Sequence, residues 1–388
     1  MDYSALNTGL WSPIIQVAIV AGVILLANVL RRKVKLIRNA MIPTAVLAGF
    51  IMLFGKIIGV IQVSRTSLTK YTEDKAMLKV ALAGVGGISG THIPAWEKME
   101  DVELVALCDI NPEHMADFPE KRCYTDYDEM LQKEELDIVD ICAPTHFHVE
   151  MSRKALEKGI HVVCEKPLSL DPADAVMLYE LAEKNNVLFM VAQVLRFEKN
   201  YLILKQLCEE KTYGRLLSLS MRRMCGMPNW NSWMPCKEKS GLAAFDMHIH
   251  DLDFCIFAFG APKKTIQHRT QGEGQDYVHG LYEYDDFFVS VEAGWFSAPY
   301  KFNAGFRAQF ENAILESGYG KFTLLDTQGN LHNLKENAEG VATINLPPSN
   351  GYFNELRYFA DCVRDGKPQD IVKKWEVETA LSIAKAFG

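Results

Sequence analysis

The stretch Leu78–Gly90 reads Leu-Lys-Val-Ala-Leu-Ala-Gly-Val-Gly-Gly-Ile-Ser-Gly, and it decides the fold. The apolar run Val80–Ala83 breaks directly into glycines, which is typical of a buried parallel strand that enters a tight turn and then a helix. Gly84 permits the turn, and Gly86 has no Cβ, so a pyrophosphate can approach the backbone. The following helix directs its free N–H groups and the positive end of its dipole at that anion.

A carboxylate further along the chain completes this pattern. The third glycine position is Ser89, which is still small enough for the helix to pack closely on the strand. A second apolar run, Val102–Cys108, ends in Asp109, about 20 residues past the glycines, where an acidic side chain accepts hydrogen bonds from an adenosine ribose. This carboxylate would repel a 2′-phosphate, so the sequence predicts NAD rather than NADP. The alternative is an ordinary β–α turn with a solvated Asp109.

Composition excludes several classes of protein. A chain of 388 residues predicts two to three domains, and a net charge of −8 argues against a nucleic-acid partner. The nine cysteines are scattered and form no Cys-x-x-Cys pair. They indicate reduced thiols in a cytoplasmic catalytic domain, with neither a disulfide framework nor a metal site.

Residues 1–63 differ in character from the rest. The apolar runs Pro13–Leu30 and Ala40–Val63 are each about long enough to cross a bilayer, and a basic cluster lies between them. The segment resembles the first membrane segments of a sodium/glutamate symporter, through Leu30-Arg-Arg-Lys33, Ile42-Pro-Thr44 and Ala48-Gly-Phe50. This resemblance implies membrane association through residues 1–63, with 64–76 as a polar linker. A fusion, a misjoined gene model and a genuine anchor all remain open.

Residues 77–197 alternate between strands and helices, which predicts a doubly wound parallel sheet with its ligand at the carboxyl ends of the strands. Helices are expected at Met151–Lys158 and Ala173–Lys184, the second beginning at Asp171-Pro172. Strands are expected at Val80–Ala83, Val102–Cys108, Ile138–Ala143, His161–Cys164 and Val187–Val194.

Residues 198–388 predict an α+β domain with an antiparallel sheet. One helix is expected at Leu242–Phe259, and two closing helices at Tyr352–Val363 and Glu376–Ala386. The alternating or aromatic-rich strands are Gly280–Tyr284, Phe287–Ala293, Phe306–Phe310 and Lys321–Leu325.

The motif Cys164-Glu165-Lys166-Pro167 ends one of the predicted parallel strands. A lysine at this edge projects into the cofactor crevice, where its ammonium can bind a substrate oxygen and stabilise charge on it. The alternative is a solvated lysine at a strand end. The nearby stretch Pro144-Thr145-His146-Phe147-His148 directly follows a predicted strand and opens a helix, and it should border the cofactor. His148 is equally well explained as a packing or capping residue.

The stretch Asp246–Asp253 holds a second candidate group. On a helix, Asp246 and His250 share one face, so the carboxylate can orient the imidazole as in a general-base pair. Solvated charges at a helix start are the alternative. The His248-x-His250 spacing chelates a metal from a strand rather than from a helix, so no metal is predicted.

Residues 77–388 resemble the glucose–fructose oxidoreductase / inositol dehydrogenase (Gfo/Idh/MocA) family in the order of their motifs. These are Gly-Val-Gly-Gly-Ile at 84–88, Cys-Asp-Ile at 108–110, Pro144-Thr145-x-x-His148, Glu165-Lys166-Pro167, Arg196-Phe197, Ser240-Gly241, Asp246-x-x-x-His250 and Glu355-x-x-x-Phe359. The resemblance implies a Rossmann domain at 77–197 and, at 198–388, a substrate-binding domain with an open-faced sheet through which copies of the chain form oligomers. It also implies a cofactor site formed by Gly84, Gly86, Gly87, Ile88, Asp109, Pro144, Thr145, His148, Glu165, Lys166 and Arg196.

The family's activity is reversible hydride transfer between NAD(P) and a secondary alcohol of a sugar or cyclitol. Carried over by motif, His250 would accept the hydroxyl proton, Lys166 would hold the same oxygen, and Asp246 would orient the pair. A sugar site could be lined by Trp230 and Trp233, which stack on pyranose rings, and by the dipeptide Arg222-Arg223, which would suit an acidic or phosphorylated sugar. The tryptophans fit a core or an interface equally well. An NAD-dependent glycosidase of the same fold and a non-catalytic NAD-binding regulator remain alternatives.

Overall fold

The computed structural model describes residues 77–228, 231–334 and 350–388. The expectations for residues 1–63 and the linker 64–76 fall outside the described residues. Within the described ranges, no helix is both long and apolar enough to cross a membrane. All nine cysteines lie in these ranges, and none of them forms a disulfide there.

The first domain contains a sheet of six parallel strands in the order β3-β2-β1-β4-β5-β6. This order confirms the predicted doubly wound sheet, and it reverses between β1 and β4, where the ligand crevice of such sheets lies. The strands are β1 (Leu78–Ala83), β2 (Val102–Cys108), β3 (Arg122–Tyr124), β4 (Ile138–Ile141), β5 (His161–Glu165) and β6 (Phe189–Ala192).

Four helices connect these strands: α5 (Ser89–Glu97), α6 (Tyr127–Lys133), α7 (Thr145–Glu157) and α8 (Pro172–Lys184). Asp171 caps α8 as predicted, because its side chain accepts a hydrogen bond from the Ala173 N–H at 3.1 Å. Helix α7 begins at Thr145, six residues earlier than expected, directly after the N-cap Pro144. The stretch from Pro144 to His148 therefore opens a helix, as predicted.

The second domain is built on a sheet of eight strands in the order β14-β13-β12-β11-β7-β10-β9-β8. They are β7 (Leu216–Gly226), β8 (Lys264–Gly272), β9 (Gln275–Glu283), β10 (Phe288–Phe296), β11 (Asn303–Phe310), β12 (Ala313–Gly318), β13 (Lys321–Asp326) and β14 (Leu331–Asn333). The expectation of an antiparallel sheet needs one correction, since β10 runs parallel to β7. The chain crosses from β7 to β8 through helices, and such a crossover joins strands of the same direction.

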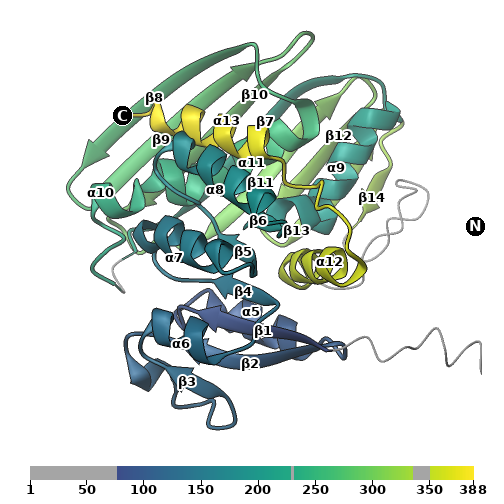
Figure 1. The fold of residues 1–388 in the computed structure, drawn as a ribbon. Helices are drawn as coiled ribbons and strands as arrows, with labels where there is room; N and C mark the ends of the chain where they lie inside the picture. Colours follow the sequence, from purple (N-terminus) through teal and green to yellow (C-terminus); the bar gives the residue numbers. More distant parts are fainter. Residues whose placement is uncertain (1–76, 229–230, 335–349) are drawn as a thin grey trace, which may run out of the picture. The chain divides into compact units, whose positions relative to one another are not determined.

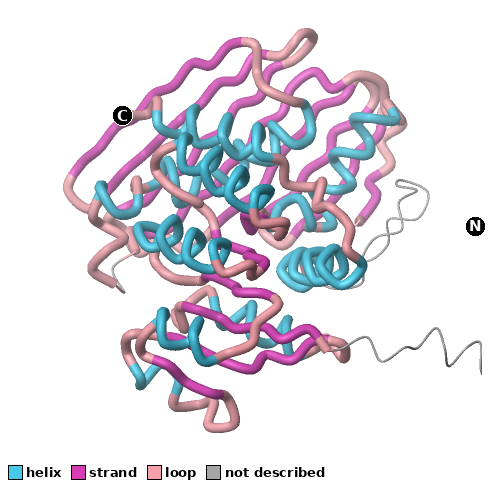
Figure 2. The backbone as a smooth tube through the Cα atoms, viewed as in Figure 1, coloured by secondary structure: helices cyan, strands magenta, loops and turns pink. Residues whose placement is uncertain are grey.

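Helices cover one face of this sheet. Figure 1 shows α9 (Lys199–Glu210), α11 (Ile249–Phe259) and α13 (Lys374–Lys385) on the same side of the strands, and Figure 2 shows the two sheets and these helices by type. The predicted helix Leu242–Phe259 is divided, because a π-helical turn, Ala244–His248, precedes α11. This division affects the candidate site.

Helix α12 (Gly351–Asp365) joins the second domain to the first. It packs against α5, and its Arg357 and Arg364 side chains both bind the Asp101 carboxylate. The C-terminal part of the chain therefore packs on the helix that follows the glycine-rich turn.

Candidate active site

The glycine-rich turn has the shape that an anion site needs. Gly84 has φ +97°, and a Cβ there would lie 2.4 Å from the backbone nitrogen of Ala143, so only glycine fits this close approach. A Cβ on Gly86 or Gly87 would meet no atom within 4 Å. The turn therefore packs closely against the residues after β4 at Gly84, and space for a ligand remains beside Gly86 and Gly87.

The start of α5 leaves its backbone donors available. Ile88 is the N-cap and provides no side-chain cap within the described chain, and no acidic residue lies in the first turn. Ser89 is buried and donates from Oγ to the Gly86 carbonyl at 2.6 Å, in keeping with its expected role as a small packing residue. These features fit a bound pyrophosphate, held by Gly86, Gly87 and the first N–H groups of α5.

Asp109 lies beside this turn. Its Oδ2 accepts a hydrogen bond from the Val85 N–H and its Oδ1 one from the Asn111 N–H, both at 2.8 Å. Oδ1 also lies 3.2 Å from Nδ1 of His114. Since a carboxylate oxygen has two lone pairs, Oδ2 can still accept a hydroxyl. Asp109 is thus held by the turn in a position that suits a ribose.

Lys166 follows β5, and its ammonium is held by a single residue of the second domain. Nζ donates to the Asp246 carboxylate oxygen Oδ1 at 3.1 Å and to the Asp246 carbonyl at 2.9 Å. The two side chains are 14% and 22% exposed, so the pair is only partly accessible to solvent. The strand end and the π-helical turn thereby fix the ammonium in place.

His250 lies in the first turn of α11 and is half-buried. Burial lowers its pKa well below the ordinary value, and the nearby cations Lys166 and Arg223 lower it further. Its imidazole is therefore neutral near pH 7 and able to accept a proton. The imidazole Nδ1 has no hydrogen-bond partner among the described residues.

The expected pairing of Asp246 with His250 needs a correction. Asp246 lies in the π-helical turn, which has more residues per turn than an α-helix, so the four-residue spacing does not stack the two side chains regularly. In the described part of the chain, the hydrogen bond and ion pair of the Asp246 carboxylate are both with Lys166. The carboxylate therefore orients the lysine rather than the imidazole.

Lys166, Asp246 and His250 all line one cavity of about 430 Å³. The structure thus brings together the three residues predicted to be catalytic. The lining also includes Glu198, Trp295 and Tyr352, which the sequence analysis did not single out. Glu198 directly follows the Arg196-Phe197 motif in the sequence, and this position next to a motif could have marked it as a candidate site residue.

Glu165 and His148 lie behind the Lys166 loop. Glu165 is buried, and its Oε2 accepts a hydrogen bond from the Lys166 N–H at 2.9 Å. The ring of the buried His148 lies 2.8 Å from the Pro167 carbonyl through Nδ1 and 2.7 Å from the Ala143 carbonyl through Nε2. This geometry favours the packing alternative for His148, while the neighbouring Pro144 and Thr145 begin α7.

Arg196 requires a correction. Its guanidinium is buried and binds the Asp253 carboxylate through Nε at 2.8 Å and Nη2 at 2.6 Å. It also binds Glu376 and the Ile371 carbonyl. The expected contact with a cofactor is replaced by a buried ion-pair network between α11 and α13. The sequence cannot reveal this role, because the partners lie far along the chain.

We expect Arg196→Met to destabilise the protein by about 3–5 kcal/mol, since it leaves buried carboxylates without their counter-charge. Urea unfolding measures this loss. NAD affinity, measured below the unfolding transition, should stay within about twofold of wild type, because a twofold change is well under 1 kcal/mol. A large loss of NAD affinity at unchanged stability would restore the cofactor-binding role.

The residues expected to line a sugar site do not lie together in the structure. Arg223 lines the cavity, but its buried guanidinium binds Asp251 at 3.0 and 3.1 Å. Arg222 instead binds Asn303 and lies over the Tyr319 ring. Trp233 is half-buried beside His146, with ring centroids 6.1 Å apart, and Trp230 is outside the described residues.

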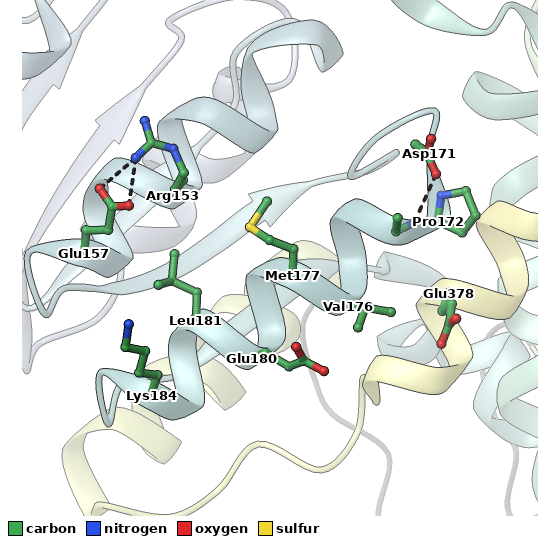
Figure 3. Close-up of a pocket in the computed structure, with 11 residues that line it drawn as sticks. Arg153, Glu157, Asp171, Pro172, Val176, Met177, Glu180, Leu181, Lys184 and Glu378 are labelled. Atoms are coloured by element: carbon green, nitrogen blue, oxygen red, sulfur yellow. Dashed lines mark hydrogen bonds and ion pairs between the residues drawn. The ribbon is translucent and has the colours of Figure 1, made fainter.

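A second depression, of about 690 Å³, lies between α7, α8 and α13 (Figure 3). None of its lining residues is buried, and its charged groups face solvent, as does the Arg153–Glu157 pair. It contains no group prepared for catalysis, so the cavity at Lys166 is the candidate active site.

A dinucleotide-binding Rossmann domain, with a lysine at its crevice and a sheet domain that completes the cavity, defines a class of two-domain oxidoreductases. The chain belongs to the GFO/IDH/MocA oxidoreductase family. Residues 78–193 match the family's NAD-binding Rossmann fold and residues 201–316 match its C-terminal domain. The protein is thus an NAD(P)-dependent oxidoreductase, and its Rossmann domain binds NAD.

Two of the curated relatives are named as dehydrogenases of a glucoside and of an inositol. The D-glucoside 3-dehydrogenase of Escherichia coli (strain K12) is 30% identical over 244 residues, which are 59% of this chain and 68% of that protein. The myo-inositol 2-dehydrogenase of Thermotoga maritima is 28% identical over 195 residues, which are 49% of this chain and 57% of that protein. The match thus spans little more than half of the second relative.

Solved structures share the fold. A levoglucosan dehydrogenase in complex with NADH and levoglucosan superposes with a TM-score of 0.69 at 19% identity, covering 80% of this chain and 96% of that one. A dehydrogenase from Chromobacterium violaceum has a TM-score of 0.66 at 18% identity, covering 80% of this chain and 94% of that one. At these identities the likeness concerns the fold alone.

Proposed function

We propose that the protein oxidises a secondary alcohol of a neutral sugar or cyclitol and passes the hydride to NAD. The observation that carries this proposal is the cavity in which Lys166 and the neutral His250 meet at the carboxyl end of β5. The relatives named as glucoside and inositol dehydrogenases support the substrate class.

Each of the three site residues has its own role in the proposed reaction. NAD, when bound, supplies the hydride acceptor. Lys166 donates a hydrogen bond from Nζ to the substrate oxygen and stabilises the negative charge that develops there. Asp246 holds that ammonium in place, and an imidazole nitrogen of His250 accepts the hydroxyl proton.

The charges of the cavity favour a neutral substrate. The Arg223 guanidinium is neutralised by Asp251, and the Lys166 ammonium by Asp246, so neither cation is left unpaired to attract a carboxylate or phosphate. Lys166 uses two of its three N–H donors on Asp246, and the third remains for a substrate hydroxyl. Glu198 accepts the Gly351 N–H at 3.2 Å through Oε1 and offers its other oxygen to sugar hydroxyls. The Nε1 donor of Trp295 is buried and has no partner in the described structure. An uncharged polyol matches such acceptors and donors.

Nicotinamide absorbance tests the proposal, with NAD and a panel of neutral pyranosides, inositols, sugar acids and sugar phosphates. We expect net NADH with a neutral member and little with the charged ones. Release of free sugar without net NADH would favour the glycosidase. Binding of NAD without any reaction would favour the regulator and contradict the proposal.

We propose that Asp109 sets the preference for NAD. Asp109→Asn keeps an oxygen for the Val85 N–H but removes the charge that would repel a 2′-phosphate. Since a charged hydrogen bond contributes about 1.5–3 kcal/mol, the ratio of NADP to NAD dissociation constants should fall at least about tenfold. Fluorescence titration of both cofactors measures this ratio, with the exposed Asp117→Asn as the control. An unchanged ratio would exclude Asp109 as the determinant.

We also propose that the open face of the large sheet joins copies of the chain. Phe288, Ile314 and Leu325 are exposed on the face turned away from the helices, at 47%, 39% and 40%. Light scattering on the full chain should give the mass of a dimer or tetramer, whereas a monomer at micromolar concentration would contradict this proposal.

A further inference from the structure

His92 lies at the centre of a buried polar cluster that the mechanism does not use. It belongs to α5, the helix that follows the glycine-rich turn, and it is fully buried. Its Nδ1 lies 2.8 Å from Oδ2 of Asp140 in β4, and its Nε2 lies 3.1 Å from Oε1 of Glu165 at the end of β5. One imidazole therefore bridges a helix and two neighbouring strands.

The bridge is charged. Only an imidazolium has N–H donors on both ring nitrogens, and here both nitrogens face carboxylates. Burial alone would lower the pKa of His92, but the Asp140 carboxylate and the Cys142 sulfur, 3.4 Å from Nδ1, more than compensate and raise it well above the ordinary value. Trp96 donates to the same Asp140 oxygen at 2.7 Å, so that carboxylate is held from two sides.

The bridge ends at the loop after β5 that carries Lys166. Oε1 of Glu165 faces His92, and Oε2 accepts the backbone N–H of Lys166 at 2.9 Å. On the other side of that residue, the Pro167 carbonyl faces the ring of His148 at 2.8 Å. The backbone that carries Lys166 is thus tied to α5 through His92 and to α7 through His148.

We propose that His92 is a positioning residue for Lys166, because it holds the Glu165 carboxylate that fixes the Lys166 backbone relative to the cofactor-binding turn. This inference rests on the proposed function, in which the Lys166 ammonium must lie at the substrate oxygen. A displacement of about 1 Å at such a group can cost about 100-fold in rate.

A matched pair of variants tests the bridge. Gln places its amide N–H near the position of Nε2, so His92→Gln keeps a donor for Glu165. Asn places its N–H near the position of Nδ1, so His92→Asn keeps only the donor for Asp140. We expect kcat to fall less than about fivefold in His92→Gln and about 100-fold in His92→Asn, with similar urea midpoints in both variants. Equal losses of kcat in the two variants would overturn the proposal.

A second readout does not depend on turnover. Acetic anhydride modifies lysine side chains, and peptide mass spectrometry gives the rate at Lys166. We expect this rate to rise several-fold in His92→Asn and to stay near wild type in His92→Gln, because only the first releases the Lys166 loop. Unchanged acetylation in both would overturn the proposal.

Should these variants fold poorly, Glu165→Ala must give the same increase in the acetylation rate of Lys166, and its failure to do so would also overturn the proposal. Wild-type NADH production tests the proposed function separately.

Discussion

Replacing Lys166 with methionine should lower kcat by about 1000-fold and leave the dissociation constant of NAD within about twofold of wild type. Methionine has a similar length but no charge, so the substrate oxygen loses the ammonium that stabilises its developing charge. Preorganised donors of this kind are worth about 100- to 1000-fold in rate, and removing a full charge falls at the upper end. Steady-state kinetics and an NAD titration measure the two quantities.

Lys184→Met provides the matched control. Lys184 is exposed at the end of α8 and lines the shallow depression of Figure 3, away from the candidate active site. This variant should keep the wild-type kcat. A Lys166→Met enzyme with wild-type kcat would remove the lysine from the mechanism, whatever its affinity for NAD.

The second large effect is expected at His250. His250→Asn removes the proton acceptor while it keeps a side chain of related shape, and general-base catalysis contributes about 100- to 10,000-fold. We expect kcat/KM to fall by at least about 100-fold, with urea stability close to wild type. The control is His268→Asn, in the exposed edge strand β8. A loss of less than about fivefold would exclude His250 as the base.

The pH dependence of kcat/KM tests the role of His250 independently of the substitution. The active form has a neutral His250, and because the pKa of this group is lowered, activity should persist as pH falls below the ordinary histidine value. Lys166 is one of the cations that lower this pKa, so in Lys166→Met the acidic limb of kcat/KM should move to higher pH. A shift to lower pH would contradict the electrostatic account of the cavity.

The sequence predicts the elements that have strong local patterns. The apolar runs of the Rossmann domain are buried from both faces, and Val102–Cys108 was placed with its observed bounds. The glycines of the turn also had a local reason, since Gly84 must allow a close backbone approach. Such features depend on a few adjacent residues, and a single sequence contains them.

Other elements depend on the fold as a whole. β8 was not predicted, because its residues are mostly polar and exposed. β7 was missed although residues 217–222 alternate between apolar and polar side chains, which is a strand pattern. The π-helical turn was also unforeseen, although it decides that Asp246 meets Lys166 rather than His250. Sequence periodicity shows which helical positions share a face only where the helix is regular.

The site residues, too, are predictable where a local motif marks them and unpredictable where only the tertiary structure brings their partners together. Lys166, Asp246 and His250 were singled out by their motifs, and the fold brings all three to one cavity. Arg196 was misplaced because its partners Asp253 and Glu376 come together only in the tertiary structure. His92 follows the glycine-rich turn by only a few residues, but its carboxylate partners are on two separate strands.

The most direct test of the central claim follows the transferred hydrogen. The full chain is incubated with NAD and a mixture of neutral pyranosides and cyclitols that carry deuterium on their ring carbons, and the mass of the reduced nicotinamide is measured. We predict NADH that carries one deuterium, and almost none of it with the Lys166→Met variant. NADH without deuterium, or bound NAD that is never reduced, would contradict direct hydride transfer from a sugar or cyclitol carbon in this cavity.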